Sequence, residues 1–305
     1  LEATVAELED KKIAALSEGA LVVDLEAEKL PVCMIRKSDG GFNYATTDLA
    51  TIQTRIKEFD PEDIIYVTDE RQQLHFKQVF LVAKKMGITS KLTHVWFGLM
   101  RLPEGTFSTR EGNVIKLEKL LDEAEARALA MVQEASPDME PDKQAEVARA
   151  VGIGAIKYVD LSQNPESLVT FTWEKAMSLE GNSAPYLQYA YARIASVQDK
   201  YAEQFPGQDP ASYSIHLTEP IERRLVLRIL RFGVAVQDAA RHHRPNILAD
   251  YLFVLAQDYS TFYQTTPFLK AEEGVRESRV RVCALVARTL RTGLELLGIH
   301  TPDRI

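Results

Sequence analysis

Residues 136–144, SPDMEPDKQ, divide the chain into two stretches with different hydrophobic patterns. Pro137 and Pro141 restrict the backbone and remove donors, so a helix that reaches this segment must end there. After the break, apolar residues recur every three or four positions, which is the period of an amphipathic helix. This spacing predicts helices over residues 143–159, 185–204, 219–242, 246–263 and 275–297. We therefore expect the C-terminal part to be an all-α bundle.

Before the break, strand-like and helix-like patterns alternate. Residues 63–69 form a short apolar run typical of a buried strand, residues 71–87 have helical spacing that ends at a glycine, and residues 92–100 are again strand-like. A strand, a helix and a second strand in this order favour a parallel, doubly wound sheet. Two further strands are predicted upstream, over residues 20–25 and 30–36.

The segment DGGFNYATTDLA, residues 39–50, places a phenol and a carboxylate four residues apart near a predicted helix start. Apolar residues at helical spacing follow its Gly-Gly turn, and Thr46 or Thr47 is the expected N-cap. Tyr44 and Asp48 would then share one side of the helix. Asp48 either complements the positive end of the helix dipole or faces a ligand, and the pattern alone leaves both readings open.

Ligands of doubly wound sheets bind beyond the carboxyl ends of the strands. Here these positions are Thr68, Asp69 and Gln72 after one strand, and the polar loop of residues 101–115 after the next. The loop, RLPEGTFSTREGNVI, is compatible with a β-hairpin. It is also compatible with a phosphate-binding loop in which Arg110, nearby hydroxyls and backbone N–H groups meet a triphosphate.

Charge is distributed unevenly along the chain. The formal net charge is −8, yet residues 185–305 carry 15 Lys and Arg against 13 Asp and Glu, and 13 of those 15 cations are arginine. This segment is therefore at +2 and residues 1–184 are at −10. Arginine forks suit phosphate contacts, but a solvated helical surface gives the same count, so charge alone does not decide whether nucleic acid binds.

The two cysteines, Cys33 and Cys283, lie far apart without neighbouring thiols, which argues against a disulfide framework or a zinc site. No apolar run approaches the roughly eighteen residues of a membrane helix, and no secretory signal begins the chain. We therefore expect a cytoplasmic protein with no membrane partner and no metal ligands. Because the first residue is Leu1 rather than Met, we also expect that the chain begins partway through a longer protein or was processed.

Seven segments match, in order, the motifs of one enzyme family. They are RKSDGGFNYATTDLA, IIYVTDERQQLHFKQVF, HVWFG, FSTREGNVIKLEKLLDEA, GIGAIKYVDLSQN, LEGNSAPYLQYAYARI and LELLGIHTPDRI. Each is modest alone, but together they run from the first part of the chain to its end. On these motifs the chain resembles the arginyl-tRNA synthetases. The resemblance implies a class I aminoacyl-tRNA synthetase, which activates arginine with ATP and transfers it to tRNA(Arg).

The resemblance implies that Tyr44, Asp48 and Gln72 line a pocket for the substrate arginine. A carboxylate receives a guanidinium through two parallel charge-assisted hydrogen bonds, a geometry that lysine cannot copy. Asp48 is thus expected to bind the guanidinium group. Asp69 and His75 are candidates for supporting positions, although each also fits a local role at the start of a helix.

Residues 107–112, FSTREG, stand where class I enzymes carry the KMSKS-type loop, whose cations stabilise the charge on the departing pyrophosphate. Arg110 is the expected catalytic cation, with Ser108 and Thr109 positioning it. The segment departs from the family pattern because Arg110 is its only cation, and the next lysine after it is Lys116.

ATP, accompanied by Mg²⁺, is the implied cosubstrate, and no tightly bound cofactor or structural metal is expected. The resemblance implies ATP contacts from His94, Phe107 and Gly112. His94 also fits a histidine that packs at a strand end under a loop.

One class I signature is absent from this sequence. Class I enzymes carry an H-x-G-H motif that contacts the ATP phosphates, and none of the six histidines stands in such a motif. We therefore expect the chain to be the C-terminal portion of such an enzyme, to have the missing N-terminal part as a partner, and to form no adenylate alone. The alternative is a non-catalytic tRNA-binding fragment or a degenerate paralogue.

The helical part resembles the anticodon-binding bundle of the family, which implies tRNA contacts from Tyr186, Gln188, Tyr189 and Arg193. Aromatic rings stack on unpaired bases while arginine meets phosphate. The tyrosines cannot all face one way at this spacing, so we expect Tyr186, Tyr189 or both to pack in the bundle and at least one ring to be free. The segment RHHRPN, residues 241–246, either contacts phosphate or caps a helix.

The expected architecture is the second half of a Rossmann-like α/β nucleotide-binding fold followed by an all-α anticodon-binding bundle. The predicted parts are residues 1–136, the C-terminal half of a catalytic domain with its KMSKS-type loop, residues 137–184, a connecting helical region that contacts the tRNA stem, and residues 185–305, the anticodon-binding domain.

Overall fold

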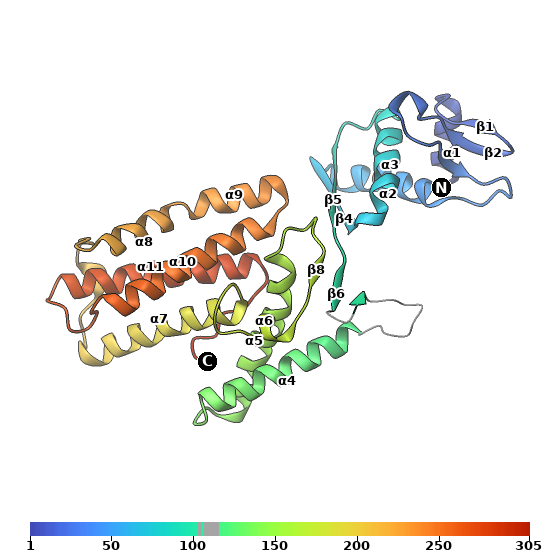
Figure 1. The fold of residues 1–305 in the computed structure, drawn as a ribbon. Helices are drawn as coiled ribbons and strands as arrows, with labels where there is room; N and C mark the ends of the chain where they lie inside the picture. Colours follow the sequence, from blue (N-terminus) through green and yellow to red (C-terminus); the bar gives the residue numbers. More distant parts are fainter. Residues whose placement is uncertain (103–104, 107–115) are drawn as a thin grey trace. The chain divides into compact units, whose positions relative to one another are not determined.

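The computed structural model describes residues 1–102, 105–106 and 116–305, and these divide into two compact units, residues 1–99 and 100–305. Figure 1 shows the elements of each unit, coloured along the chain. The predicted break at residues 136–144 is confirmed as the end of one helix and the start of another, and it lies inside the second unit.

The first unit mixes helices and strands. Its elements are α1 (Glu2–Asp10), β1 (Ala15–Ser17), β2 (Ala20–Val23), η1 (Glu26–Glu28), β3 (Cys33–Arg36), α2 (Tyr44–Phe59), β4 (Asp63–Asp69), η2 (Glu70–Gln72), α3 (Gln73–Lys85) and β5 (Lys91–Phe97). The predicted β-α-β unit is confirmed, because β4 and β5 are parallel and α3 connects them. The two predicted upstream strands are present as β2 and β3, but with β1 they form an antiparallel sheet of their own.

Helices α2 and α3 pack against each other and build the core of this unit. Leu49 and Ile52 from α2 and Val79 and Val82 from α3 are all fully buried in one apolar cluster. Their spacing of three residues within each helix places them on one face, which is why the sequence forms amphipathic helices here. Burying such side chains contributes about 1.5–3 kcal/mol each.

The start of α2 differs from the prediction. Asn43 is the N-cap, and its side chain accepts a hydrogen bond from the backbone N–H of Tyr44. Thr46 is buried and its hydroxyl donates to the carbonyl of Ile35, so this threonine ties the helix to β3 instead of capping it. The expected cap at Thr46 or Thr47 was therefore wrong, because the helix begins one turn earlier.

The second unit is mainly helical. Its elements are β6 (Met100–Leu102), β7 (Gly105–Thr106), α4 (Leu117–Ala135), α5 (Pro141–Leu161), β8 (Val169–Thr170), α6 (Trp173–Ala176), α7 (Ala184–Gln204), η3 (Pro210–Ser212), α8 (Pro220–Leu230), α9 (Phe232–His242), α10 (Pro245–Thr265) and α11 (Val275–Leu296). The helices predicted from periodicity are confirmed, except that residues 219–242 form two helices. The two helices are separated at Arg231, where the backbone N–H donates a hydrogen bond to the carbonyl of Arg228, three residues earlier, and forms a tighter turn.

Helices α4 and α5 approach each other closely at Gly152. A Cβ atom at this position would lie 2.6 Å from the carbonyl oxygen of Ala124. Real Cβ atoms do not come so near to backbone, so glycine is required for this packing. A separate buried apolar cluster surrounds this contact, and its members include Ala128, Val132, Val147 and Val151.

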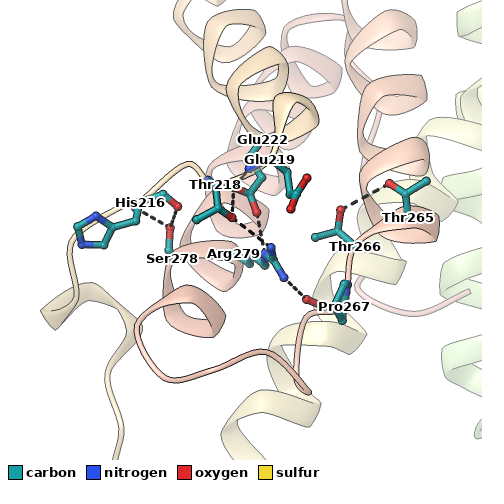
Figure 2. Close-up of polar contacts among 9 residues, drawn as sticks. All are labelled: His216, Thr218, Glu219, Glu222, Thr265, Thr266, Pro267, Ser278 and Arg279. Carbon is teal, nitrogen blue, oxygen red and sulfur yellow. Dashed lines mark hydrogen bonds and ion pairs between the residues drawn. The ribbon is translucent and has the colours of Figure 1, made fainter.

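A buried ion pair joins α8 to α11 within the bundle (Figure 2). Glu222 Oε1 accepts from Arg279 Nε at 2.7 Å, and the two side chains are 1% and 7% exposed. The other oxygen of Glu222 accepts from the N–H groups of Thr218 and Glu219, which completes a capping box at the start of α8. Burial alone would raise the pKa of Glu222, but these backbone hydrogen bonds and the guanidinium outweigh it and lower the pKa.

Both cysteines are free and buried. Burial raises the pKa of the Cys33 thiol to about 11, so this sulfur stays protonated and unreactive near neutral pH. Within the described ranges, no group of three or more His, Cys, Asp or Glu residues is placed to hold a metal ion. No helix in the same ranges combines the length and hydropathy needed to span a bilayer.

Candidate functional site

A side-chain hydrogen bond links the second turn of α2 to the first turn of α3. His75 Nε2 lies 2.6 Å from Asp48 Oδ2, and the two side chains are 27% and 28% exposed. The second carboxylate oxygen, Oδ1, has no hydrogen-bond partner among the residues that the structure describes. Asp48 is therefore held by one oxygen and reaches solvent, so it can still accept a ligand donor.

The other two predicted arginine-pocket residues lie one turn before this pair. Tyr44 is the first residue of α2 and is 82% exposed, four residues before Asp48. Gln72 ends η2, is exposed, and stands three residues before His75. Tyr44 and Asp48 share a face of α2 because they are four residues apart, and the Asp48–His75 contact joins this helix to α3, which follows Gln72 directly. A phenol, a carboxylate and an amide open to solvent form a suitable set of partners for a cation with several N–H donors.

The neighbouring acid, Asp69, serves a local role. It caps η2 by accepting from the N–H of Arg71, and its side chain pairs with the Arg71 guanidinium at 2.6 Å. The hydrogen bond from Arg71 lowers the pKa of Asp69 and keeps it ionised. Of the two candidate supporting residues, His75 contacts Asp48 directly, whereas Asp69 is occupied by its own neighbour.

His94 lies in the middle of β5, directly opposite Tyr66 in β4, and not at a strand end. Its Nε2 is 2.8 Å from Thr68 Oγ1, and its ring centroid is 4.7 Å from that of Phe76. Burial, assisted by the positive charges of His75 and Lys77, lowers the pKa of His94. The imidazole is therefore neutral at neutral pH, and its contact with ATP stays a prediction.

The predicted KMSKS-type loop lies outside the described residues. This applies to Phe107, Ser108, Thr109, Arg110 and Gly112. The segment before it forms the antiparallel pair β6–β7, in which Arg101 is opposite Thr106 and Leu102 is opposite Gly105.

Helix α7 presents an arginine between aromatic rings. The Arg193 guanidinium lies over Tyr189 at 4.7 Å and over Tyr263 of α10 at 4.8 Å. Tyr189 keeps an exposed ring, whereas Tyr186 packs edge-on against Phe253 at 5.8 Å. The expectation that one tyrosine packs and another stays accessible is confirmed, and Tyr263 is a neighbour that the sequence pattern did not reveal because it lies on another helix.

Gln188 requires a correction. It was predicted to contact tRNA, but its side chain is 0% exposed. Its Nε2 donates to the carbonyls of Ala150 at 3.1 Å and His300 at 2.7 Å. Gln188 therefore ties α7 to α5 and to the C-terminal segment, and it cannot reach an RNA on the surface.

The segment of residues 241–246 ends α9. His243 adopts the left-handed conformation at the C-cap with φ 53°, and His242 Nδ1 bonds the carbonyl of Asp238. Arg244 pairs with Glu166 at 3.1 Å. These contacts favour the helix-capping interpretation of this segment.

Two family models match the chain in succession. Residues 1–173 match "tRNA synthetases class I (R), catalytic domain" and residues 187–305 match "DALR anticodon binding domain". The chain thus belongs to the class I aminoacyl-tRNA synthetases, with a catalytic domain followed by an all-helical anticodon-binding domain. A curated relative from Fusobacterium nucleatum, "Arginine--tRNA ligase", is 42% identical over 97% of the chain. Within class I, the chain is a member of the arginyl-tRNA synthetase family.

Other relatives agree. The "Arginine--tRNA ligase" of Chloroflexus aurantiacus is 42% identical over 94% of this chain and 50% of the relative. Solved arginyl-tRNA synthetases from Thermus thermophilus and Plasmodium falciparum superpose with TM-scores of 0.84 and 0.85, at 28% and 25% identity. Each match covers 100% of this chain, but only 58% and 52% of the solved chains. The Fusobacterium match covers 52% of that protein, so the chain spans about half the length of the curated relatives it matches.

Proposed function

We propose that this chain is the C-terminal part of an arginine–tRNA ligase. In the complete protein it contributes to the ATP-dependent activation of arginine and to the transfer of arginine to tRNA(Arg), while its helical domain binds the anticodon region. The observation that carries the proposal is the Asp48 carboxylate, which is 28% exposed and hydrogen-bonded to His75 through one oxygen, in a chain of this family that also exposes Tyr44 and Gln72.

The geometry at Asp48 supports recognition of a guanidinium. Each carboxylate oxygen has two lone pairs, so Oδ2 can accept from His75 and from a ligand together, while Oδ1 is open. A guanidinium presents paired N–H donors in a fork that fits both oxygens, which a lysine ammonium does not. The hydrogen bond with His75 holds the carboxylate in one orientation before the ligand arrives.

ATP with Mg²⁺ is the proposed cosubstrate, and Mg²⁺ binds mainly through the ATP phosphates. Arg110 is the proposed cation for the departing pyrophosphate, with Ser108 and Thr109 beside it, and His94, Phe107 and Gly112 are the proposed ATP contacts. Cations placed where charge develops lower the barrier to reaction. Further phosphate contacts would have to come from another part of the protein, because the sequence has no H-x-G-H motif.

The proposed tRNA contacts on α7 are Tyr189 and Arg193, with Tyr186 beside them. Arg193 lies over the rings of Tyr189 and Tyr263, which fixes the guanidinium and leaves the Tyr189 ring accessible. An exposed ring beside a fixed arginine suits stacking on an unpaired base with a phosphate nearby.

The second candidate is a tRNA-binding protein that does not charge tRNA. The specific observation in its favour is the missing H-x-G-H motif, which leaves half of the expected ATP contacts unaccounted for. On this reading the helical domain binds tRNA(Arg), and the α/β part is a non-catalytic remnant.

Three measurements test the proposal. ATP–pyrophosphate exchange with arginine should be absent for the 305-residue chain alone and present when the N-terminal part of a related synthetase is added or fused. Filter binding at stated salt should show tighter binding of tRNA(Arg) than of a mismatched tRNA. Exchange by the chain alone at the rate of an intact synthetase contradicts the proposal. Specific tRNA binding without exchange in the combined sample establishes the second candidate.

A further inference from the structure

The outer face of α8 and α9 carries aliphatic side chains that no other described element covers. Leu227, Leu230 and Val234 are 54%, 74% and 57% exposed. Leu227 and Leu230 are three residues apart on α8, which puts them on one face, and Val234 follows four residues later on α9. Scattered exposed leucines are ordinary, but a row at helical spacing is typical of a surface that receives another helix.

A shallow groove of about 320 Å³ accompanies this row. It is lined by Pro220, Arg223, Arg224, Leu227, Arg228 and Arg231. Four of its six lining residues are therefore arginines.

The four arginines are not equivalent. Arg224 and Arg228 share the mostly buried Asp258 of α10, at 3.0 Å and 3.3 Å. Arg223 and Arg231 are exposed and have no acidic partner within the described part of the chain. The groove thus keeps two cations without an acidic partner among the described residues, and Leu227 of the aliphatic set lines it beside them.

This face is separate from the candidate tRNA surface. Helices α10 and α11 each contact α7 and α8, and Figure 1 shows them between α7 and the α8–α9 pair. Tyr189 and Arg193 belong to α7. An RNA held at α7 therefore leaves the α8–α9 face available for another partner.

We propose that the α8–α9 face is a docking site for an acidic amphipathic helix of a partner protein. The aliphatic row supplies the apolar seam, and Arg223 and Arg231 pair with carboxylates that flank the seam of the partner. RNA phosphates would satisfy the arginines but would leave the three aliphatic side chains without an apolar partner. The combination of both features therefore favours a helix over RNA.

The test uses the whole chain and a synthetic peptide of about three heptads, with leucine at every a and d position and glutamate at every e and g position. Fluorescence anisotropy should show binding in the micromolar range that weakens as salt is raised. Arg223→Glu combined with Arg231→Glu should weaken binding about tenfold or more. Leu230→Ser should weaken it by roughly threefold or more while salt dependence is kept.

A matched control reverses the same number of charges elsewhere in the unit. Lys200→Glu combined with Lys270→Glu changes two exposed cations on α7 and after α10, and it should leave peptide affinity within about twofold. Equal weakening by the control pair, or unchanged binding by the arginine pair, overturns the proposal. The proposal is also overturned if the unaltered chain does not bind the peptide and the Arg223→Glu/Arg231→Glu variant loses tRNA binding. That result would assign the groove to RNA.

Discussion

His75 Nε2 and Asp48 Oδ2 lie 2.6 Å apart, although 27 residues separate them in the sequence. The contact joins the second turn of α2 to the first turn of α3 and orients the Asp48 carboxylate. Its consequence for arginine binding can be measured in the complete enzyme.

Asp48→Asn in the complete enzyme should raise the KM for arginine by about 30-fold, because a hydrogen bond to a charged partner contributes roughly 2 kcal/mol. The KM for ATP should change by less than about twofold, since the carboxamide is nearly the same size. Glu58→Gln on the same helix is the matched control, because this side chain is exposed and should leave both constants unchanged. A similar rise in both KM values would rule out the proposed role of Asp48.

His75→Ala tests positioning by the second partner of the pair. Without the imidazole the carboxylate rotates freely, so the KM for arginine should rise by roughly three- to tenfold, with a smaller change in kcat. His75→Gln retains an N–H donor and should restore part of the affinity. If alanine and glutamine behave alike, or if only kcat changes, His75 does not act through Asp48.

Gly152→Ala should destabilise the second unit by about 2 kcal/mol or more, because the added Cβ would lie 2.6 Å from backbone that cannot move aside. Gly233→Ala is the matched control in another helix, where nothing lies within 4 Å of the new atom. That change should be neutral or stabilising by up to about 1 kcal/mol. Urea unfolding followed by circular dichroism measures both, and equal effects would contradict the close approach of α4 and α5.

Arg279→Ala should cost about 3–5 kcal/mol, because Glu222 would remain buried without its cation. Figure 2 shows that the guanidinium also donates to the carbonyl of Pro267, which would lose its partner as well. Lys143→Ala, which breaks the exposed pair with Glu146, should cost less than about 1 kcal/mol. Comparable losses of unfolding free energy in the two variants would show that the buried pair contributes no more than a surface pair.

Alkaline pH should destabilise the helical unit through its buried and partly buried tyrosines, among them Tyr191, Tyr201 and Tyr251. Burial raises the pKa of Tyr191, Tyr201 and Tyr251 to about 12 each. In the unfolded chain a tyrosine titrates near about 10, so between these values the unfolded chain releases protons that the folded chain retains. The contribution of each tyrosine to the free energy of unfolding should therefore be fully present below about pH 10. It should fall by about 1.4 kcal/mol per pH unit as the pH rises towards 12. Tyr251→Phe should reduce this slope, and an unchanged slope would exclude Tyr251 as a contributor.

Much of the fold follows from local pattern. Helices α5, α7, α10 and α11 and the β4–α3–β5 unit were predictable because each has a clear apolar period over many residues. The antiparallel sheet was not, because β1 has only three residues, all of them exposed, and thus carries no alternation to detect. The division of residues 219–242 at Arg231 was missed for a similar reason, since one tighter turn leaves the apolar spacing intact.

The candidate site was predictable only in its chemistry. The residue types at positions 44, 48 and 72 indicate cation binding once the family is suspected, but no local signal places His75 against Asp48. Gln188 shows the opposite failure. Its neighbours on α7 are tyrosines and an arginine suited to RNA, yet the helix turns this amide inward, where only tertiary contacts with residues 150 and 300 explain it.

The last residues of the chain are anchored at several points. The carbonyl of His300 accepts a hydrogen bond from the Gln188 side chain, and the carbonyl of Ile305 accepts one from the Ser136 hydroxyl. The Asp303 carboxylate accepts from the Tyr191 hydroxyl and from the Arg291 guanidinium. A purification tag or fluorescent label joined directly to Ile305 should therefore disturb these contacts. A loss of tRNA affinity in such a fusion would then reflect the loss of these C-terminal hydrogen bonds. It would not show that a tRNA-binding residue had been altered.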